Sequence, residues 1–278
     1  MNYQAILESI QSDLKDYKNT GKVATYIPEL GKVDASKFGL HLNCINGNHY
    51  HLGASQERFS IQSISKVLSL AFALKLEGNK LWNRVDVEPS GDPFNSLVQL
   101  EYEKGIPRNP FINAGALVVS DILMSHLKNP KEDFLQYVRD IAGDQSIDYD
   151  TSVAASEMQH KYRNAALAHL MKDFKNINND VDALLDFYFH QCAIAMSCQQ
   201  LAQAFSIFLN YSKQDQSQQA LAVPPMLAKR INALMLTCGF YDESGEFAFR
   251  VGLPGKSGVG GGIVALHPKH YSIAVWSP

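Results

Sequence analysis

Ser63 and Lys66 are the residues whose types and spacing best suit chemistry. The tetrad Ser63-Ile64-Ser65-Lys66 matches Ser-x-x-Lys, a pattern of serine acyl-transfer enzymes in which a lysine stands beside the nucleophile. Residues three apart share one face of a helix, so the Lys66 amine could lie against the Ser63 hydroxyl. The tetrad alone is weak support, because about one match is expected by chance, and Ser12–Lys15 and Ser125–Lys128 also match.

The surroundings of Ser63 separate it from the other two matches. The Ser12 tetrad lies on the charged side of an N-terminal helix, and the Ser125 tetrad lies at a helix end. Ser63 instead opens a run to Leu76 that is apolar nearly all round, and a helix of that kind is buried. Burial lowers the pKa of a lysine, so Lys66 could serve as a base and activity should rise toward mildly alkaline pH. The alternative is that Lys66 snorkels to the surface.

A second candidate is the glycine-rich stretch Gly255 to Gly262, which begins Gly-Lys-Ser-Gly. It fails the phosphate-loop pattern, because Arg250 stands where the first glycine should be, and it fails the dinucleotide pattern at Ile263. Nucleotide binding is therefore rejected. A strand carrying Lys-Ser-Gly is typical of an acyl-transfer cleft, like the Lys-Thr-Gly of penicillin-recognising enzymes.

A third candidate is a set of polar residues in the middle of the chain. Asn113 lies in the segment from Arg108 to Ala116 and could simply cap the helix that follows. Glu157 and Asn164 are seven residues apart, which places them on one face if the helix is continuous. Most such pairs are ordinary surface residues.

Cysteines and histidines give no pattern of a metal site. No Cys-x-x-Cys occurs, and no cysteine stands near a histidine at zinc-finger spacing. We expect reduced, mostly buried thiols and a cytoplasmic protein with no metal; the four cysteines are Cys44, Cys192, Cys198 and Cys238. No role is assigned to three histidines without consistent partner spacing, namely His160, His169 and His190.

Length and composition exclude several classes of protein. The 278 residues are 46% hydrophobic and 19% charged, with a net charge of −3, which excludes general disorder and argues against nucleic acid or an anionic membrane as a partner. The longest apolar stretch, Val67 to Leu76, is too short to span a bilayer. The N-terminus predicts an amphipathic helix and no signal peptide.

The pattern of elements predicts an α+β fold. A hairpin is expected from Phe38 to Gly53, helices from Pro110 to about Ala233, and three neighbouring strands over Glu246–Leu253, Gly258–Leu266 and His270–Trp276. We expect one antiparallel sheet flanked by helices, and a helical second lobe with a cleft between. The predicted boundaries are an α/β lobe at 1–75 and 225–278 and a helical lobe at 76–224.

Taken together, these segments resemble the serine-dependent glutaminases, relatives of the β-lactamase and penicillin-binding fold. The match runs in order along nearly the whole chain. Its segments are residues 21–30, 59–67, 87–96, 109–116, 185–189, 238–242 and 251–263. Seven segments in register could not arise by chance, and they imply a β-lactamase- or transpeptidase-like fold in a single catalytic unit over residues 1–278.

The resemblance implies hydrolysis of L-glutamine to L-glutamate and ammonia through a glutamyl-enzyme. Ser63 would be the nucleophile and Lys66 its general base, and the oxyanion hole maps onto the backbone N–H groups of Ser63 and Val259. Tyr26 would close over the substrate, and Tyr188 could pass a proton to the leaving ammonia. The resemblance implies no cofactor, and a homodimer or homotetramer.

The resemblance also implies which residues bind the substrate. They are Gln62, Ser63, Asn113, Glu157, Asn164, Tyr188, Tyr241 and Val259. The assignment makes chemical sense, because a free α-amine needs a carboxylate while an α-carboxylate needs amide and hydroxyl donors. Such a pocket would reject peptides and nucleotides.

Three departures from the family and two rival functions accompany this interpretation. The helix after Cys198 lacks the usual Asn-Gly-Gly ending and reads Leu209-Asn210-Tyr211-Ser212. Lys161-Tyr162 stands where the family usually carries Gly-Asp, and the chain stops at Pro278 where relatives continue into a last helix, so we expect that helix to be absent. One rival is the same acyl-enzyme chemistry on a β-lactam or peptide amide, against which Glu157 argues. The other is a binding module that captures an amino acid without turnover, against which Ser63 and Lys66 argue.

Overall fold

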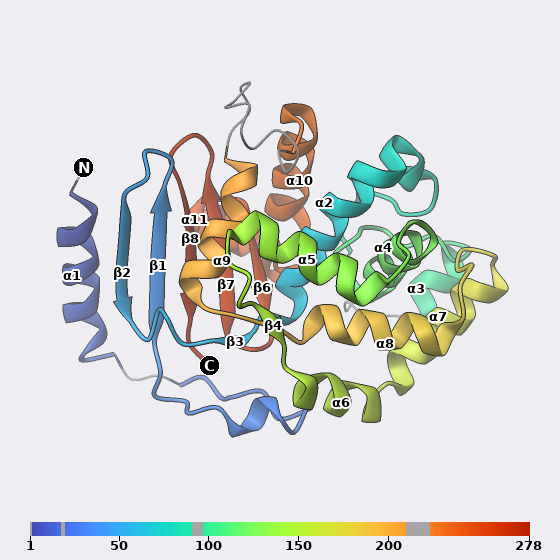
Figure 1. Cartoon of the computed structure of the whole chain (residues 1–278), viewed down its shortest axis with the longest axis horizontal. Coiled ribbons are helices and arrows are strands. Elements are labelled where there is room, and N and C mark those ends of the chain that lie inside the picture. The colour runs from blue at the N-terminus through green and yellow to red at the C-terminus, as the bar shows by residue number, and fades with distance from the viewer. Residues whose placement is uncertain (1, 18–19, 91–96, 210–222) are drawn as a thin grey trace.

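The computed structural model (Figure 1) describes residues 2–17, 20–90, 97–209 and 223–278, so residues 91–96 of the motif segment 87–96 lie outside it. Its helices are α1 Tyr3–Leu14, α2 Ser65–Glu77, α3 Leu97–Tyr102, α4 Asn113–His126, α5 Pro130–Ala142, α6 Thr151–Gln159, α7 Tyr162–Asp173, α8 Val181–Cys192, α9 Cys198–Phe205, α10 Pro225–Cys238 and α11 Ser244–Val251. Its strands are β1 Gly39–Cys44, β2 His49–Gly53, β3 Phe59–Ser60, β4 Asp148–Tyr149, β5 Ile194–Met196, β6 Gly255–Gly258, β7 Gly262–His267 and β8 Tyr271–Trp276. None of the described helices has the length and apolar character needed to cross a membrane.

Five antiparallel strands in the order β2-β1-β8-β7-β6 form the main sheet. The N-terminal hairpin and the C-terminal strands therefore share one sheet, as the sequence predicts, and Gly39 pairs with Gly53 across the hairpin. The apolar stripe of α1 covers one face, where Leu7 packs on Leu40 and Leu52. Helix α9 covers the opposite face, where Gln203 accepts a hydrogen bond from Asn43.

The predicted strand over Glu246–Leu253 is wrong, because most of that segment is the helix α11. The alternation of apolar residues suggested a strand, yet alternate positions do not share an environment: Phe247 stacks on Phe240, whereas Phe249 is 91% exposed. An i,i+4 ion pair between Glu246 and Arg250 supports the helix instead. The first C-terminal strand is therefore the shorter β6, which carries Lys256.

Helix α2 is the centre of the hydrophobic core, as its apolar sequence predicts. It packs against α4, α5, α8 and α10, and Figure 1 shows it between the sheet and the helices α3, α4, α7 and α8. Lys66 in its first turn is 1% exposed, so the alternative of a lysine snorkelling to the surface is wrong.

A buried ion pair anchors α4, the helix that begins at Asn113. Asp121 is fully buried, and its carboxylate accepts hydrogen bonds from the Arg84 guanidinium at 2.6 Å and from the Asn178 and Asn179 backbone N–H groups. Removing one partner of such a pair leaves an uncompensated charge and unpaired donors in the interior.

Asp121→Ala is therefore expected to lower the free energy of unfolding by about 3–5 kcal/mol. The matched control is Lys131→Ala, which removes a half-exposed ion pair with Asp186 and should cost less than about 1 kcal/mol. Urea unfolding followed by circular dichroism measures both. Equal losses in the two variants would contradict the anchoring role.

Candidate active site

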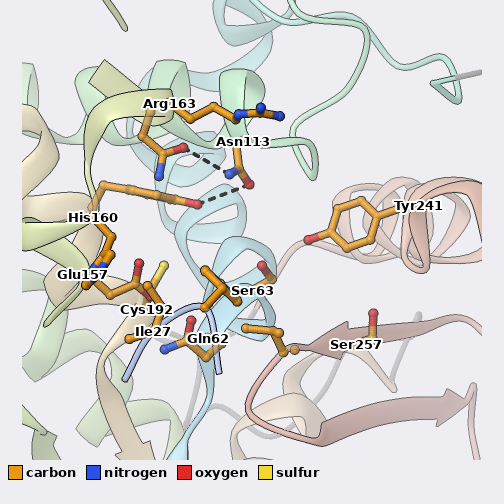
Figure 2. A pocket seen from close by; sticks show the side chains of 15 residues that line it. Ile27, Gln62, Ser63, Asn113, Glu157, His160, Arg163, Cys192, Tyr241 and Ser257 are labelled. Carbon is orange, nitrogen blue, oxygen red and sulfur yellow. Dashed lines mark hydrogen bonds between the residues drawn. The ribbon is translucent and has the colours of Figure 1, made fainter. Parts of the chain in front are cut away.

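A cavity of about 640 Å³ opens where the start of α2 meets α4, α6, α7, α8 and the turn between β6 and β7 (Figure 2). Every predicted site residue except Lys66 lines it. These residues are Tyr26, Gln62, Ser63, Asn113, Glu157, Asn164, Tyr188, Tyr241 and Val259. Ser257 and Gly258 of the Lys-Ser-Gly stretch also line the cavity. The sequence gave no site role to Ile27, His160, Arg163 or Cys192, which line it as well.

Ser63 lies in a 3-10 turn, Gln62–Ile64, directly before α2. Gln62 has a φ of +49°, a left-handed conformation that costs a non-glycine residue about 1–3 kcal/mol and persists only where surrounding contacts enforce it. Those contacts are hydrogen bonds from the Gln62 side chain to the Ser60 hydroxyl and from the Ser65 hydroxyl to the Gln62 carbonyl, each of 2.8 Å. The turn thereby holds Ser63 directly before the N-terminus of α2.

The Lys66 ammonium group makes three hydrogen bonds. Its Nζ donates to the Phe111 carbonyl at 3.1 Å, to Asn113 Oδ1 at 2.7 Å and to the Tyr241 hydroxyl at 3.3 Å. The Tyr241 hydroxyl is also hydrogen-bonded to Ser63. Tyr241 therefore connects the predicted nucleophile to the predicted base, a position that the sequence did not reveal.

Tyr241 lies between two buried cations. The Nζ of Lys256 is 4.2 Å from the centre of the Tyr241 ring, and that of Lys66 is 5.5 Å away. Burial by itself raises the pKa of this phenol, but the charges of Lys256 and Lys66 and the hydrogen bonds from Ser63 and Lys66 outweigh it and lower the pKa to about 7. Tyr241 can therefore exchange a proton near neutral pH.

Lys256 is fully buried on β6 and is held by the backbone. Its Nζ donates to the carbonyl groups of Gly239 and Ser257, each at 2.8 Å. Burial, together with the charge of Lys66, lowers the pKa of Lys256 to about 8. The Lys-Ser-Gly motif thus supplies a cation to this cleft.

Two glycines bring the turn that carries Val259 against the turn that carries Ser63. A Cβ atom at Gly258 would lie 2.5 Å from the Ile61 carbonyl oxygen, and one at Gly260 would lie 2.5 Å from that of Ser60. Only glycine permits an approach this close. Ser63 and Val259 consequently lie on neighbouring turns that line one cavity.

Glu157, Asn113 and Asn164 supply further polar groups to the cavity. Figure 2 shows Glu157 and Tyr241 on opposite sides of Ser63. Glu157 is 6% exposed. Burial raises its pKa to about 7, although the Gln62 hydrogen bond and the charge of Lys66 favour the ionised form. Asn113 Nδ2 donates to Asn164 Oδ1 at 3.0 Å.

Glu157 and Asn164 do not share one continuous helix, which was the condition for their spacing to place them on one helix face. Helix α6 ends at Gln159 and α7 begins at Tyr162, and His160 and Lys161 form the turn between them. Both residues still line the cavity, because the chain changes direction between α6 and α7 and both helices border the cavity. The change of direction lies where the family pattern Gly-Asp is replaced.

Two tyrosines complete the wall of the cavity. Tyr188 on α8 is buried, its hydroxyl lies 3.5 Å from Asn113 Oδ1, and burial raises its pKa well above the ordinary value. Tyr26 lies at the entrance and is 59% exposed. Within the described ranges, no group of three or more His, Cys, Asp or Glu side chains is arranged to hold a metal ion.

Comparison with known proteins gives a consistent result. The family model described as Glutaminase matches residues 21–278. A glutaminase of Christiangramia forsetii is 59% identical over the whole chain, covering 91% of that protein, and one of Saccharophagus degradans is 57% identical, covering 90% of it.

Solved structures agree in fold. A structure named "Probable glutaminase ybaS" superposes with a TM-score of 0.91 at 30% identity, covering the whole of this chain and 91% of the other. A Bacillus glutaminase superposes with a TM-score of 0.82 at 34% identity, covering 91% and 87%. These neighbours have the β-lactamase-like fold, so the predicted fold class is confirmed.

Proposed function

The chain belongs to the glutaminase family of amidohydrolases, and from this premise we propose that it hydrolyses L-glutamine to L-glutamate and ammonia through an ester on Ser63. One observation carries the proposal. A single cavity holds a serine that is hydrogen-bonded into a tyrosine–lysine pair and, across from it, a buried carboxylate. The γ-amide of glutamine would fit beside the serine, and its free α-amine would fit beside the carboxylate.

In the first half-reaction, the Ser63 oxygen attacks the γ-carbonyl carbon of glutamine. Its proton passes to the Tyr241–Lys66 pair, in which Lys66 is the general base and Tyr241 connects it to Ser63. The backbone N–H groups of Ser63 and Val259 stabilise the negative oxygen of the tetrahedral intermediate.

Collapse of that intermediate breaks the carbon–nitrogen bond and leaves a glutamyl ester on Ser63. The departing nitrogen takes up a proton and leaves as ammonia. Tyr188 is suited to donate this proton, because its raised pKa keeps the phenol protonated. The proton that the Tyr241–Lys66 pair took from Ser63 passes to Tyr188, so both groups return to their starting state. Water then attacks the ester and gives a proton to the Tyr241–Lys66 pair, which passes it to the Ser63 oxygen as the ester bond breaks and glutamate leaves.

The two ends of the amino acid would meet different partners. Glu157 would hold the α-ammonium group, and the substrate's charge would keep this carboxylate ionised. Gln62, which is hydrogen-bonded to Glu157, would hold it in place. Asn164 would donate to the α-carboxylate, and Tyr26 at the entrance would cover the bound molecule.

The direct test is ammonia release from L-glutamine by the purified chain, measured beside hydrolysis of a penicillin and of a dipeptide whose second residue is glutamine. We expect turnover of L-glutamine to exceed that of the other two substrates by far, because Glu157 favours a free α-ammonium group next to the γ-amide. Hydrolysis of the penicillin at a comparable rate would support the rival acyl-transfer function. Binding of L-glutamine without ammonia release would support the rival binding module.

We propose in addition that the protein works in the cytoplasm as a homodimer or homotetramer. The four cysteines are all free and buried, a state typical of proteins from a reducing compartment. The oligomer is proposed on the family resemblance alone.

A further inference from the structure

The part of the cavity around Glu157 and Asn164 must match the hydrogen-bond donors and acceptors of the substrate's α-ammonium and α-carboxylate groups. The α-ammonium group of an amino acid brings three N–H donors, and its α-carboxylate brings only acceptors. A pocket selective for both must therefore offer acceptors to the first and donors to the second. The inference below rests on the proposed function, because it takes glutamine as the ligand.

The side-chain oxygens of the two asparagines are already used. Asn113 Oδ1 accepts from Lys66 at 2.7 Å and from Tyr188 at 3.5 Å, and Asn164 Oδ1 accepts from Asn113 Nδ2 at 3.0 Å. Within the described part of the chain the Asn164 amide nitrogen has no hydrogen-bond partner, so it is left for a ligand, and it is a donor suited to a carboxylate. Glu157 alone does not supply acceptors in three directions to an ammonium group.

His160 lies beside Glu157 on the wall of the cavity (Figure 2). Its backbone N–H donates to the Glu157 carbonyl at 3.0 Å, which closes the end of α6. Its ring Nδ1 lies 2.8 Å from the Ser156 carbonyl oxygen. A carbonyl only accepts, so Nδ1 carries the hydrogen, and in the neutral ring Nε2 is left with a lone pair.

We propose that His160 Nε2 accepts a hydrogen bond from the α-ammonium group of the substrate, next to the one that Glu157 accepts. His160 is thus a specificity-determining residue for the free amine. Its Nδ1 contact with Ser156 fixes the tautomer that makes this possible. The hydrogen bond is charge-assisted, and bonds of that class are about twice as strong as neutral ones.

The test uses two variants and two substrates. His160→Leu removes the acceptor, whereas His160→Gln can place an amide oxygen near the position of Nε2. His169→Leu is the matched control, because His169 is an exposed histidine on α7 that does not line the cavity. The substrates are L-glutamine and its desamino analogue, glutaric acid monoamide, which has the γ-amide and the carboxylate but no amine.

For His160→Leu we expect KM for L-glutamine to rise roughly tenfold or more, the fold-change that corresponds to one hydrogen bond to a charged group, with kcat little changed. His160→Gln should recover most of the loss, and His169→Leu should match the parent. The kcat/KM for the desamino analogue should be the same in all four proteins. A rise in KM for both substrates would overturn the proposal, and so would an unchanged KM for L-glutamine.

A binding measurement separates failure of this inference from failure of the proposed function. Calorimetric titration compares L-glutamate with glutarate, which differ only in the α-amine. If the parent binds L-glutamate and His160→Leu weakens that binding without affecting glutarate, the inference stands even where no glutamine is turned over. If His160→Leu binds L-glutamate as tightly as the parent, the inference is wrong whatever the activity.

Discussion

Replacing Ser63 by alanine should lower the rate of ammonia release from L-glutamine by about 10⁴–10⁶-fold, the loss found when a nucleophile that acts as a unit with its base is removed. The reason is that Ser63 is the group that forms the covalent intermediate. The remaining groups can still bind the substrate and polarise its amide. The measurement is ammonia release under saturating L-glutamine.

A control variant and a binding measurement make this prediction specific. The control is Ser12→Ala, which removes the serine of another Ser-x-x-Lys match, on the exposed side of α1, and should leave the rate unchanged. The Ser63→Ala variant should also still bind L-glutamate in a calorimetric titration, because Glu157 and Asn164 are intact. A variant that keeps more than about a tenth of the parent's rate would show that Ser63 is not the nucleophile.

The sequence predicts the centre of the site because its parts are local. Ser63 and Lys66 lie within four consecutive positions, Ser63 in the 3-10 turn Gln62–Ile64 and Lys66 in the first turn of α2 directly after it, so their spacing alone places them near each other. The apolar surroundings of that helix correctly predict a buried lysine. The hairpin from Phe38 to Gly53 is predictable for the same reason, since its strands are joined by a short turn.

The contacts that the sequence does not reveal are the ones made between distant segments. Tyr241 is hydrogen-bonded to Lys66 although the two are 175 positions apart in the chain. Its backbone has a φ of +58°, a conformation that is uncommon for a tyrosine and cannot be predicted from the residue type. No pattern of spacing indicates that Lys256 packs on the Tyr241 ring. The effect of these two contacts on the tyrosine's pKa is therefore visible only in three dimensions.

His160 was passed over for a different reason. The proposed role of His160 depends on which ring nitrogen carries the hydrogen, and the contact of Nδ1 with the Ser156 carbonyl determines this. The break between α6 and α7 creates this contact, and the sequence left open whether the helix between Glu157 and Asn164 is continuous. Conversely, α11 shows that an alternating pattern can be overridden by packing, here the stacking of Phe247 on Phe240.

The second large effect is expected at Tyr241, whose replacement by phenylalanine should lower kcat about 10²–10⁴-fold, the usual contribution of general acid–base catalysis. Tyr241→Phe keeps the ring under Lys256 but removes the hydroxyl that joins Ser63 to Lys66. The proton of Ser63 then loses its direct route to the base. KM for L-glutamine should change far less, because Glu157 and Asn164 are untouched.

The pH dependence distinguishes this role from simple substrate contact. Tyr241 has a pKa lowered to about 7. Below pH 7 the phenol holds its proton and the Tyr241–Lys66 pair has no place for the proton of Ser63. Above pH 7 the pair has lost one proton and can accept the proton of Ser63. The kcat at saturating L-glutamine should therefore rise through pH 7 and level off on the alkaline side, and in Tyr241→Phe the residual kcat should show no such rise.

Lys256→Met provides the decisive comparison, because it removes the nearer of the two cations that oppose the effect of burial on Tyr241. The remaining desolvation should raise the pKa of the phenol, so the rise in kcat should move to higher pH while the plateau changes less. Glu157, whose pKa is also near 7, cannot account for such a shift, because the bound α-ammonium group keeps it ionised at saturation. A kcat profile that still rises at pH 7 in Tyr241→Phe would assign the titrating group to another residue and return Tyr241 to a purely binding role.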